Sequence, residues 1–365
     1  SNFVIRYPLP VLFLSSVIII FSVVGITKIH FSHDILSWFP KDSLVRQSSE
    51  KIDKKLKGAD VISVVLDFGE KNSLHNPEIL NRIDDSIEFL EGLKVGKVYV
   101  GKAWSITSII KKINQSLHGN QERYYSIPQD VNLVAQEYLL FENTGSDNLE
   151  NFTDSQYSKV RLAFKIPLFD AMHCGKFFEV IKKHFENKYS DANVIISGFG
   201  KVQIQTFRAT IFSMATSYTT ALVAITLIMF LFLGLRLGAL GMIPNLFPII
   251  FTLGLIGWLN FPMNFSNMML ACIAIGIAVD DTIHFMHVYR RNFEITGDVA
   301  QSVRTTFQTT GKAITATTFV LTIGFLIFML ATLKNFHQFG LLTAIAIFVA
   351  LLADFFIAPS LLLLL

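Results

Sequence analysis

Long runs of apolar residues occupy both ends of the chain and leave a polar stretch of ordinary globular composition between them. A helix needs about 20 mostly apolar residues to cross a bilayer. Six segments meet this length, one before the polar stretch and five after it. We therefore expect six membrane-spanning helices, at residues 9–27, 211–233, 237–259, 268–288, 313–333 and 338–360.

The polar stretch, residues 28–208, alternates between the patterns of strands and helices. Strands are expected at Val61–Phe68, Lys97–Val100, Lys159–Ile166 and Asn193–Ser197. Helices are expected at Pro77–Leu90, Trp104–Leu117, Phe169–Lys188 and, within an insertion at Gly119–Asn151, at Val131–Phe141. The order β-α-β followed by β-α-β is that of a ferredoxin-like domain. The expected fold class is an all-α six-helix membrane bundle with an inserted α+β domain.

The basic residues of the short loops predict the orientation of the bundle. Six basic residues fall on one side of the membrane: Arg6, Arg236, Arg290, Arg291, Arg304 and Lys312. The short loops on the other side contain only Lys334. Because basic loops face the cytoplasm, both chain ends are expected there, in a multi-pass protein of the cell (inner or cytoplasmic) membrane. Residues 28–208 are then extracytoplasmic. The net charge of +3 gives no reason to expect nucleic acid as a partner.

Asp280 and Asp281 lie side by side near the middle of the expected span 268–288. A carboxylate at this depth costs roughly 2.5–3.5 kcal/mol, so such residues usually serve proton or ion movement. Neighbours on a helix point about 100° apart. We therefore expect one aspartate to face the bundle interior and the other a neighbouring helix. The pair predicts a proton relay, and the alternative is a structural pair that caps a kink or forms a buried ion pair.

Other polar residues within the spans are candidates for the same relay. His284 shares a helix face with the aspartates and either relays protons or lies at the cytoplasmic interface. Thr315, Thr318 and Thr322 form one stripe, which can bind the aspartates or bond its own backbone carbonyls. Asn245, between two prolines, either lines the pathway or satisfies carbonyls that the prolines leave free.

Several features are expected to be structural. Asp354, toward the cytoplasmic end of the last span, is expected to be interfacial. Pro244 and Pro248 should kink their span. The polar segment Thr296–Gly311 should lie along the cytoplasmic surface. Close helix packing is expected at Gly254, Gly257, Gly276 and Gly324.

The layout of one large domain between the first two spans, followed by five closely spaced spans, resembles the half-unit of the RND superfamily. Residues 276–281, GIAVDD, match the GxxxDD pattern of the fourth span in its Patched-like and MMPL-like branches. Residues 282–285, 34–40, 244–248 and 354–362 extend the resemblance. The chain looks most like a carboxy-terminal half.

This resemblance implies proton-driven export of hydrophobic or amphiphilic molecules, with lipid-like substrates, by two such halves. The expected partners are the lipid bilayer, a hydrophobic small molecule or lipid, and a second six-span half in the same polypeptide or in a homologous subunit of an oligomer. The chain begins without Met and ends inside an apolar run, which favours a fragment of a longer polypeptide.

Nothing in the sequence resembles a P-loop, a catalytic triad or a metal site, so we expect neither an enzyme nor a cofactor. Two alternatives stay open. One is a protein-export accessory subunit of the Sec-associated type, against which the DDTIHF sequence argues. The other is a sterol-sensing-like membrane scaffold without transport, against which the buried charge argues.

Overall fold

The structure, a computed structural model, describes residues 2–143 and 149–364 and divides into two compact units. The helical unit comprises Ser1–Pro40 and Ala209–Leu365, and the sheet unit comprises Lys41–Arg208. The sheet unit lies within the expected inserted segment, residues 28–208, and residues 28–40 group with the helices.

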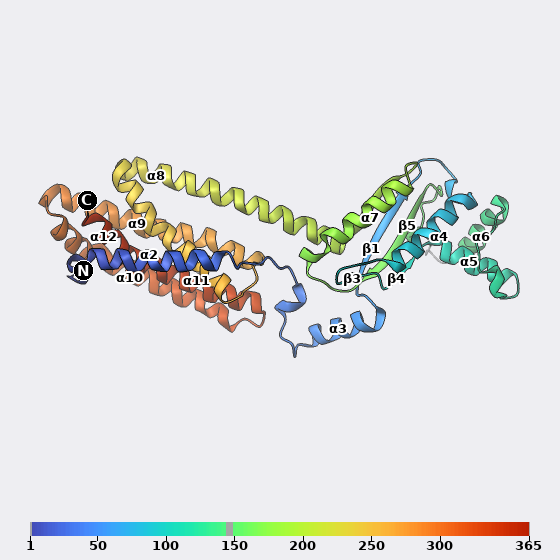
Figure 1. Ribbon diagram of the computed structural model, residues 1–365, viewed down its shortest axis with the longest axis horizontal. Helices are drawn as coiled ribbons and strands as arrows, with labels where there is room; N and C mark the ends of the chain where they lie inside the picture. The colour runs from blue at the N-terminus through green and yellow to red at the C-terminus, as the bar shows by residue number, and fades with distance from the viewer. Residues whose placement is uncertain (1, 144–148, 365) are drawn as a thin grey trace. The chain divides into compact units, whose positions relative to one another are not determined.

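Five helices of the described residues are long and apolar enough to cross a membrane (Figure 1). They are α2 (Pro8–Ile26), α8 (Phe199–Trp258), α9 (Phe265–Thr296), α10 (Val299–Leu326) and α11 (Lys334–Leu352). Short segments extend them: α1 (Asn2–Arg6), η6 (Ile327–Leu330), the π-helical turn η7 (Ala353–Ile357) and α12 (Ala358–Leu362). The chain therefore builds a mostly helical membrane bundle.

Helix α8 covers two of the six predicted spans, because the chain reverses within it (Figure 1). The helical dihedral angles break at Gly234, where φ is 79° and ψ is 169°, a conformation that only glycine adopts without strain. Beyond the break, Gly238 and Gly241 pack against Met229 of the preceding segment. We expected distortion at Pro244 and Pro248, yet the departure from helical dihedrals lies at Gly234.

Most of the polar segment Thr296–Gly311, which we expected along the cytoplasmic surface, is helical. Helix α9 ends at Thr296, Gly297 takes a left-handed conformation with φ 65°, and α10 begins at Val299. The side chain of Asp298 caps α10 by accepting a hydrogen bond from the backbone N–H of Gln301. The polar residues therefore form the first turns of α10.

Three glycines bring α2 and the second segment of α8 into backbone contact. A Cβ atom at Gly254 would meet the backbone of Ser22, and one at Gly257 would meet the carbonyl of Gly25. The indole of Trp258 reinforces the contact by donating a hydrogen bond of 3.0 Å to a carbonyl of α2. Gly276 and Gly324, which we grouped with these glycines, have open space around them, so close packing explains only part of the set.

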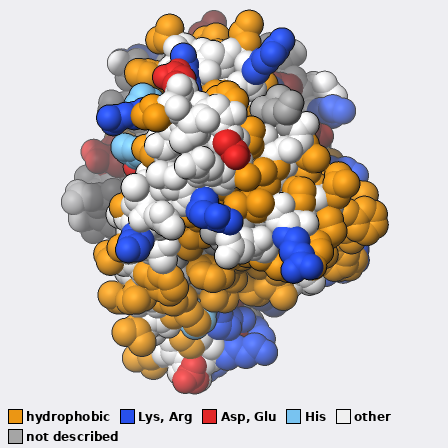
Figure 2. All heavy atoms as spheres, turned by 90° about the vertical axis from the view of Figure 1, so that its left-hand side faces the viewer, with side chains coloured by type: hydrophobic (Ala, Val, Ile, Leu, Met, Phe, Trp, Pro, Cys, Tyr) orange, Lys and Arg blue, Asp and Glu red, His pale blue; other side chains and the backbone are white. Residues whose placement is uncertain are grey.

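Both chain termini lie at the same end of the helical unit (Figure 1), where α1 packs against α12. The guanidinium group of Arg304 donates to the side chain of Asn2 over 3.1 Å, and that of Arg290 donates to the carbonyl of Phe232 over 3.3 Å. The view in Figure 2 faces this end and displays basic side chains over a largely apolar surface. Arg290 and Arg304 therefore lie toward this end of the bundle.

The sheet unit contains one four-stranded antiparallel sheet in the order β4-β5-β1-β6. Its strands are β1 (Asp60–Asp67), β4 (Lys102–Trp104), β5 (Lys159–Ile166) and β6 (Asn193–Gly198). β1 pairs with β5 along its whole length, from Asp60 opposite Ile166 to Asp67 opposite Lys159. Each β-α-β unit thus has one strand at the sheet centre and one at an edge.

Helices of the sheet unit pack with these strands around one hydrophobic core. They are α4 (Pro77–Gly92), α5 (Ile106–Leu117), α6 (Val131–Asn143) and α7 (Gly175–Lys188). Helix α3 (Leu44–Leu56) belongs to the same unit but buries none of its residues. The predicted second strand, Lys97–Val100, is misplaced: β3 (Val98–Tyr99) pairs with β2 (Lys94–Val95) in a separate small sheet, and β4 joins the main one.

The glycine contact between α2 and α8 generates a testable prediction. Gly257→Ala places a methyl group against the backbone of Gly25, so the helices must separate. We expect a loss of about 1–3 kcal/mol of stability, measured by thermal melting of the purified protein. Gly324→Ala is the matched control, since open space surrounds that helical glycine. Equal melting temperatures for the two variants would contradict the packing role.

Glu137 of α6 generates a second prediction, about pH. Its side chain is fully buried, and neither carboxylate oxygen has a hydrogen-bond partner among the described residues. Burial raises the pKa of Glu137 from 4.5 to about 7. The native state therefore holds a proton that the unfolded state releases, so this stability is fully present below pH 4.5 and is lost as the pH rises through about 7.

Glu137→Gln is accordingly expected to stabilise the sheet unit by about 2–3 kcal/mol at a pH of about 8 and to change little at a pH of about 4. Hydrogen exchange of the α6 amides in the whole protein measures this difference. The exposed Glu122 provides the control substitution, Glu122→Gln. A benefit of Glu137→Gln that is the same at both pH values would show that the carboxyl does not titrate in this range.

Candidate functional site

Helix α9 carries the central polar residues of the helical unit. It begins at the cap residue Asn264, whose side chain accepts from the backbone N–H of Asn267, and continues unbroken to Thr296. It contacts both α10 and α11. Asp281 and Thr282 point into the packed interior, with exposed fractions of 9% and 0%. The side chain of Asp280, one position earlier, is 77% exposed. The adjacent aspartates thus occupy opposite environments.

Asp280 lines a cleft between α9 and α10 of about 570 Å³. The imidazole Nε2 of His284, one turn further along α9, lies 3.7 Å from a carboxylate oxygen of Asp280. Both side chains are mostly exposed at the cleft. The other lining residues are Gly276, Ile277, Asp281, Thr310, Ala313, Ile314, Thr317 and Leu321. The carboxylate of Asp280 and the imidazole of His284 are therefore accessible from the cleft, where they can bind a proton or contact another protein surface.

The three threonines of α10 have different surroundings. The Thr315 hydroxyl donates a hydrogen bond of 2.7 Å to the carbonyl of Gly311 in its own helix. A hydroxyl that donates to the backbone in this way is not available to donate to the aspartates. Thr318 is buried close to the carboxylate of Asp281. The hydroxyls of Thr318 and Thr322 are buried and form no hydrogen bond within the described residues. The structure therefore brings Thr318 to the aspartates and leaves Thr315 bonded to its own helix.

Asn245 lies on the other side of α9, in a second polar cluster. The hydroxyl of Thr282 is 2.7 Å from Oδ1 of Asn245 and 2.5 Å from Oδ1 of Asp354. All three side chains are buried. Asn245 thus contacts Thr282, a residue that sequence reasoning missed, and no bond of its own joins it to the aspartate pair within the described part of the chain.

The prediction that Asp354 is interfacial is wrong. Its exposed fraction is 1%, because the π-helical turn η7 sets it against α9 instead of directing it toward the membrane surface. The signal available in the sequence was the acidic residue itself within an apolar span, which by default indicates function. Because Asp354 is near the end of the expected span, we interpreted it as a residue of the membrane interface.

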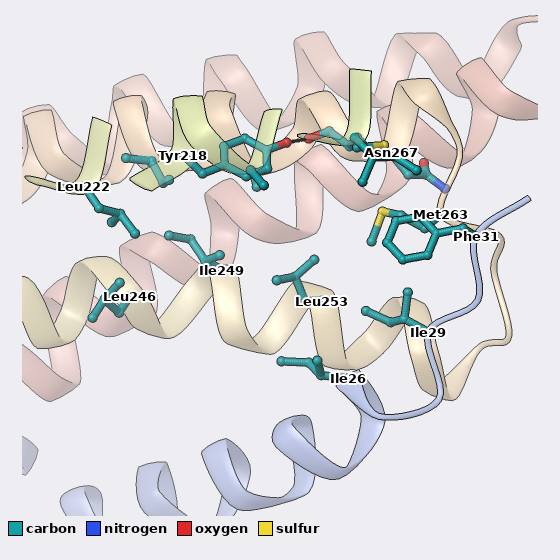
Figure 3. Close-up of a pocket in the computed structure, with 15 residues that line it drawn as sticks. Ile26, Ile29, Phe31, Tyr218, Leu222, Leu246, Ile249, Leu253, Met263 and Asn267 are labelled. Atoms are coloured by element: carbon teal, nitrogen blue, oxygen red, sulfur yellow. Dashed lines mark hydrogen bonds between the residues drawn. The ribbon is translucent and has the colours of Figure 1, made fainter. Parts of the chain in front are cut away.

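An apolar cavity of about 510 Å³ lies between α2, both segments of α8, and α9 (Figure 3). Ile26, Leu246, Ile249 and Leu253 approach it from one side in the figure, and Tyr218 and Leu222 from another. The Tyr218 hydroxyl donates to the backbone carbonyl of Met268. The full lining is Ile26, Ile29, Phe31, Ile211, Ala215, Tyr218, Leu222, Leu246, Ile249, Leu253, Met263, Asn267, Met268, Ala271 and Ile275. Its volume lies in the range of small-molecule sites.

The described residues contain no cluster of three or more His, Cys, Asp or Glu side chains that could hold a metal ion. Two acid-containing clusters of the helical unit meet at Asp281 and Thr282 of α9, which are adjacent in the sequence.

Comparison with known proteins agrees with this architecture. The chain is 20% identical over 374 aligned residues to a putative membrane protein of Methanocaldococcus jannaschii, an alignment that covers 99% of this chain and 92% of that protein. Residues 186–365, which include α8 to α12 and hence both polar clusters, match the MMPL family. Residues 186–365 of this multi-pass membrane protein thus resemble an MMPL family domain, and α2 lies outside the match.

Proposed function

We propose that this chain is one half of an RND-type transporter that uses the proton motive force to export hydrophobic or amphiphilic molecules. The observation that carries the proposal is the environment of the aspartate pair: Asp281 is buried inside the bundle, and Asp280 faces an open cleft at the middle of the same span. Asp280 can thus exchange a proton with the cleft, while Asp281 is in contact with the packed interior of the bundle.

The exposed carboxylate of Asp280 also supports the proposal that a second six-span half covers this side of the bundle. A charged side chain that meets lipid at the bilayer centre costs roughly 2.5–3.5 kcal/mol, and the cleft beside Asp280 adds His284 and the threonines of α10 to the polar surface. A second six-span half, in the same polypeptide or in another subunit, would remove this surface from lipid. The aspartates would then lie at the centre of the assembled transporter.

The apolar cavity supports a lipid-like substrate. Its lining is almost wholly hydrocarbon, with Tyr218 and Asn267 as the polar exceptions, which suits an acyl chain or another elongated apolar group. Ile275 of α9 lines the cavity, and Asp280 follows it by five positions on the same helix. Protonation at the aspartates could therefore move a wall of the cavity.

The basic end of the bundle supports the orientation. Because basic loops face the cytoplasm, the chain termini are proposed to lie there, in the cytoplasmic membrane, with the sheet unit outside. The antiparallel order β4-β5-β1-β6 suits a ferredoxin-like porter domain that would receive the substrate. Transport driven by a proton gradient requires no covalent chemistry on the substrate, so we propose no enzyme activity. A scaffold would need neither the buried acid nor the cavity, which disfavours the sterol-sensing-like alternative.

The aspartates provide the central test. Asp280→Asn and Asp281→Asn keep the shape of the side chains but cannot titrate, so each is expected to abolish substrate flux driven by an imposed pH gradient. Insertion and melting temperature should persist, because neither aspartate has a buried basic partner among the residues that the structure describes. Flux is measured with the full-length protein in liposomes.

Thr318→Val is the matched comparison, since it removes a buried polar group next to Asp281 without removing a titratable one. It should reduce flux less than either aspartate substitution, because water can replace a hydroxyl in a polar site. Normal flux in both aspartate variants would remove the proton-relay proposal. Lost flux with a collapsed melting temperature would instead assign the pair a structural role.

The cavity is tested by filling it. Ile249→Trp adds volume inside the lining and is expected to lower retention of radiolabelled palmitate by the purified protein about tenfold or more, which corresponds to about 1.4 kcal/mol. Leu231→Trp, on the exposed surface of α8, is the control and should retain palmitate normally. Equal retention by both variants would place the bound lipid elsewhere.

A further inference from the structure

The buried cluster of Asn245, Thr282 and Asp354 links three segments of the helical unit. Asn245 belongs to the second segment of α8, Thr282 to α9 and Asp354 to the π-helical turn η7. Their exposed fractions are 2%, 0% and 1%. The Thr282 hydroxyl oxygen lies 2.7 Å from the amide of Asn245 and 2.5 Å from the carboxyl of Asp354. These distances form a continuous hydrogen-bonded chain across α9.

The number of hydrogens limits how this chain can be arranged. A threonine hydroxyl has one hydrogen to donate, yet Thr282 faces an oxygen atom on each side. If Asp354 carries a proton, its O–H donates to Thr282, and Thr282 donates to Oδ1 of Asn245. If Asp354 is ionised, Thr282 donates to its carboxylate, and the Asn245 amide must turn so that its NH₂ donates to Thr282.

The two arrangements differ by one proton and by the direction of the Thr282 hydroxyl. The orientation observed, with Oδ1 of Asn245 toward Thr282, fits the proton-bound state. The Nδ2 atom of Asn245 is buried without a hydrogen-bond partner among the described residues, so it is available to donate when the amide turns. Proton binding forms one O–H bond on Asp354 and breaks no bond in the protein.

We propose that Asp354 is a third proton-binding carboxyl of this protein, beyond the aspartate pair, and that Thr282 and Asn245 stabilise its two charge states by reversing their hydrogen bonds. The proposal rests on the proposed function only in assigning this proton to a transport cycle. The cluster lies within the MMPL family domain but on the opposite side of α9 from the cleft.

The surroundings of Asp354 favour a group that binds and releases a proton over a permanent charge. Its Oδ2 atom is buried and has no hydrogen-bond partner within the described residues. Helix α2, α12 and the adjacent part of α8 at Asn245 contribute no charged side chain. The titratable group that acts on it is Asp281 of α9. A fixed carboxylate here would therefore lack the pairing that buried charges require.

Asp281 connects this site to the cleft. It precedes Thr282 on α9 and is buried between Asp280, which faces the cleft, and Asp354, which lies behind the helix. Two negative charges in this space repel, so a proton on one acid favours ionisation of the other. The three acids provide successive proton-binding positions from the cleft to the packed interior.

Infrared difference spectroscopy tests the proposal on the full-length protein in lipid nanodiscs, between acidic and alkaline pH. A buried protonated carboxyl gives its own C=O stretching band. Asp354→Asn should remove one such band. Thr282→Val should keep the band but shift its frequency, because the carboxyl loses its hydrogen-bond partner, whereas Thr282→Ser, which retains the hydroxyl, should preserve it.

A set of bands unchanged by Asp354→Asn would overturn the proposal. If Asp354→Asn fails to fold, the folded Thr282→Val variant decides, and an unshifted band would overturn it. The readout needs no substrate, so it is separable from the exporter proposal: loss of the band by Asp354→Asn in a protein that moves nothing across liposomes would keep the proton site and remove the exporter.

Discussion

The hydroxyl of Thr282 holds together the parts of the membrane bundle that carry polar groups. Through one oxygen atom it joins α8, α9 and the π-helical turn, segments that are far apart in the chain. In a bundle surrounded by lipid, apolar contacts alone give little preference for one helix rotation over another, since lipid tails are as apolar as leucine. A hydrogen-bonded cluster in the interior specifies the rotation of α9. That rotation in turn places Asp281 inside and Asp280 at the cleft.

Much of this fold follows from local sequence rules. Apolar segments of about 20 residues form helices in a membrane because the backbone must satisfy its own hydrogen bonds there. The strands β1 and β5 were predictable because their alternating residues bury one face. The second strand was misplaced, because β3 and β4 are too short to display any period and only tertiary pairing distinguishes them.

The acid cluster was harder to predict. The GxxxDD pattern identifies Asp280 and Asp281, but their division into an exposed and a buried residue depends on which helices pack against α9. Asp354 was misassigned because distance from the end of a span says nothing of helix rotation. A π-helical turn widens the helix at that point and changes the direction of the side chains, and such turns often occur at functional sites. Glycine is equally ambiguous in sequence: Gly257 contacts another backbone, whereas Gly276 lines an open cleft.

The break at Gly234 and the backbone contact at Gly25 together determine how the apolar cavity could change its volume. Helix α2 and the second segment of α8 touch through their glycines, so they form one stiff wall that resists sliding or separation. The first segment of α8 joins that wall through a single non-helical residue, and α9 faces it across the cavity. One side of the cavity is thus formed by helices in backbone contact, and the other by α9 and by a segment that a single glycine joins to that contact. A change in the volume of the cavity would therefore involve the first segment of α8 turning at Gly234 rather than a separation of α2 from the second segment.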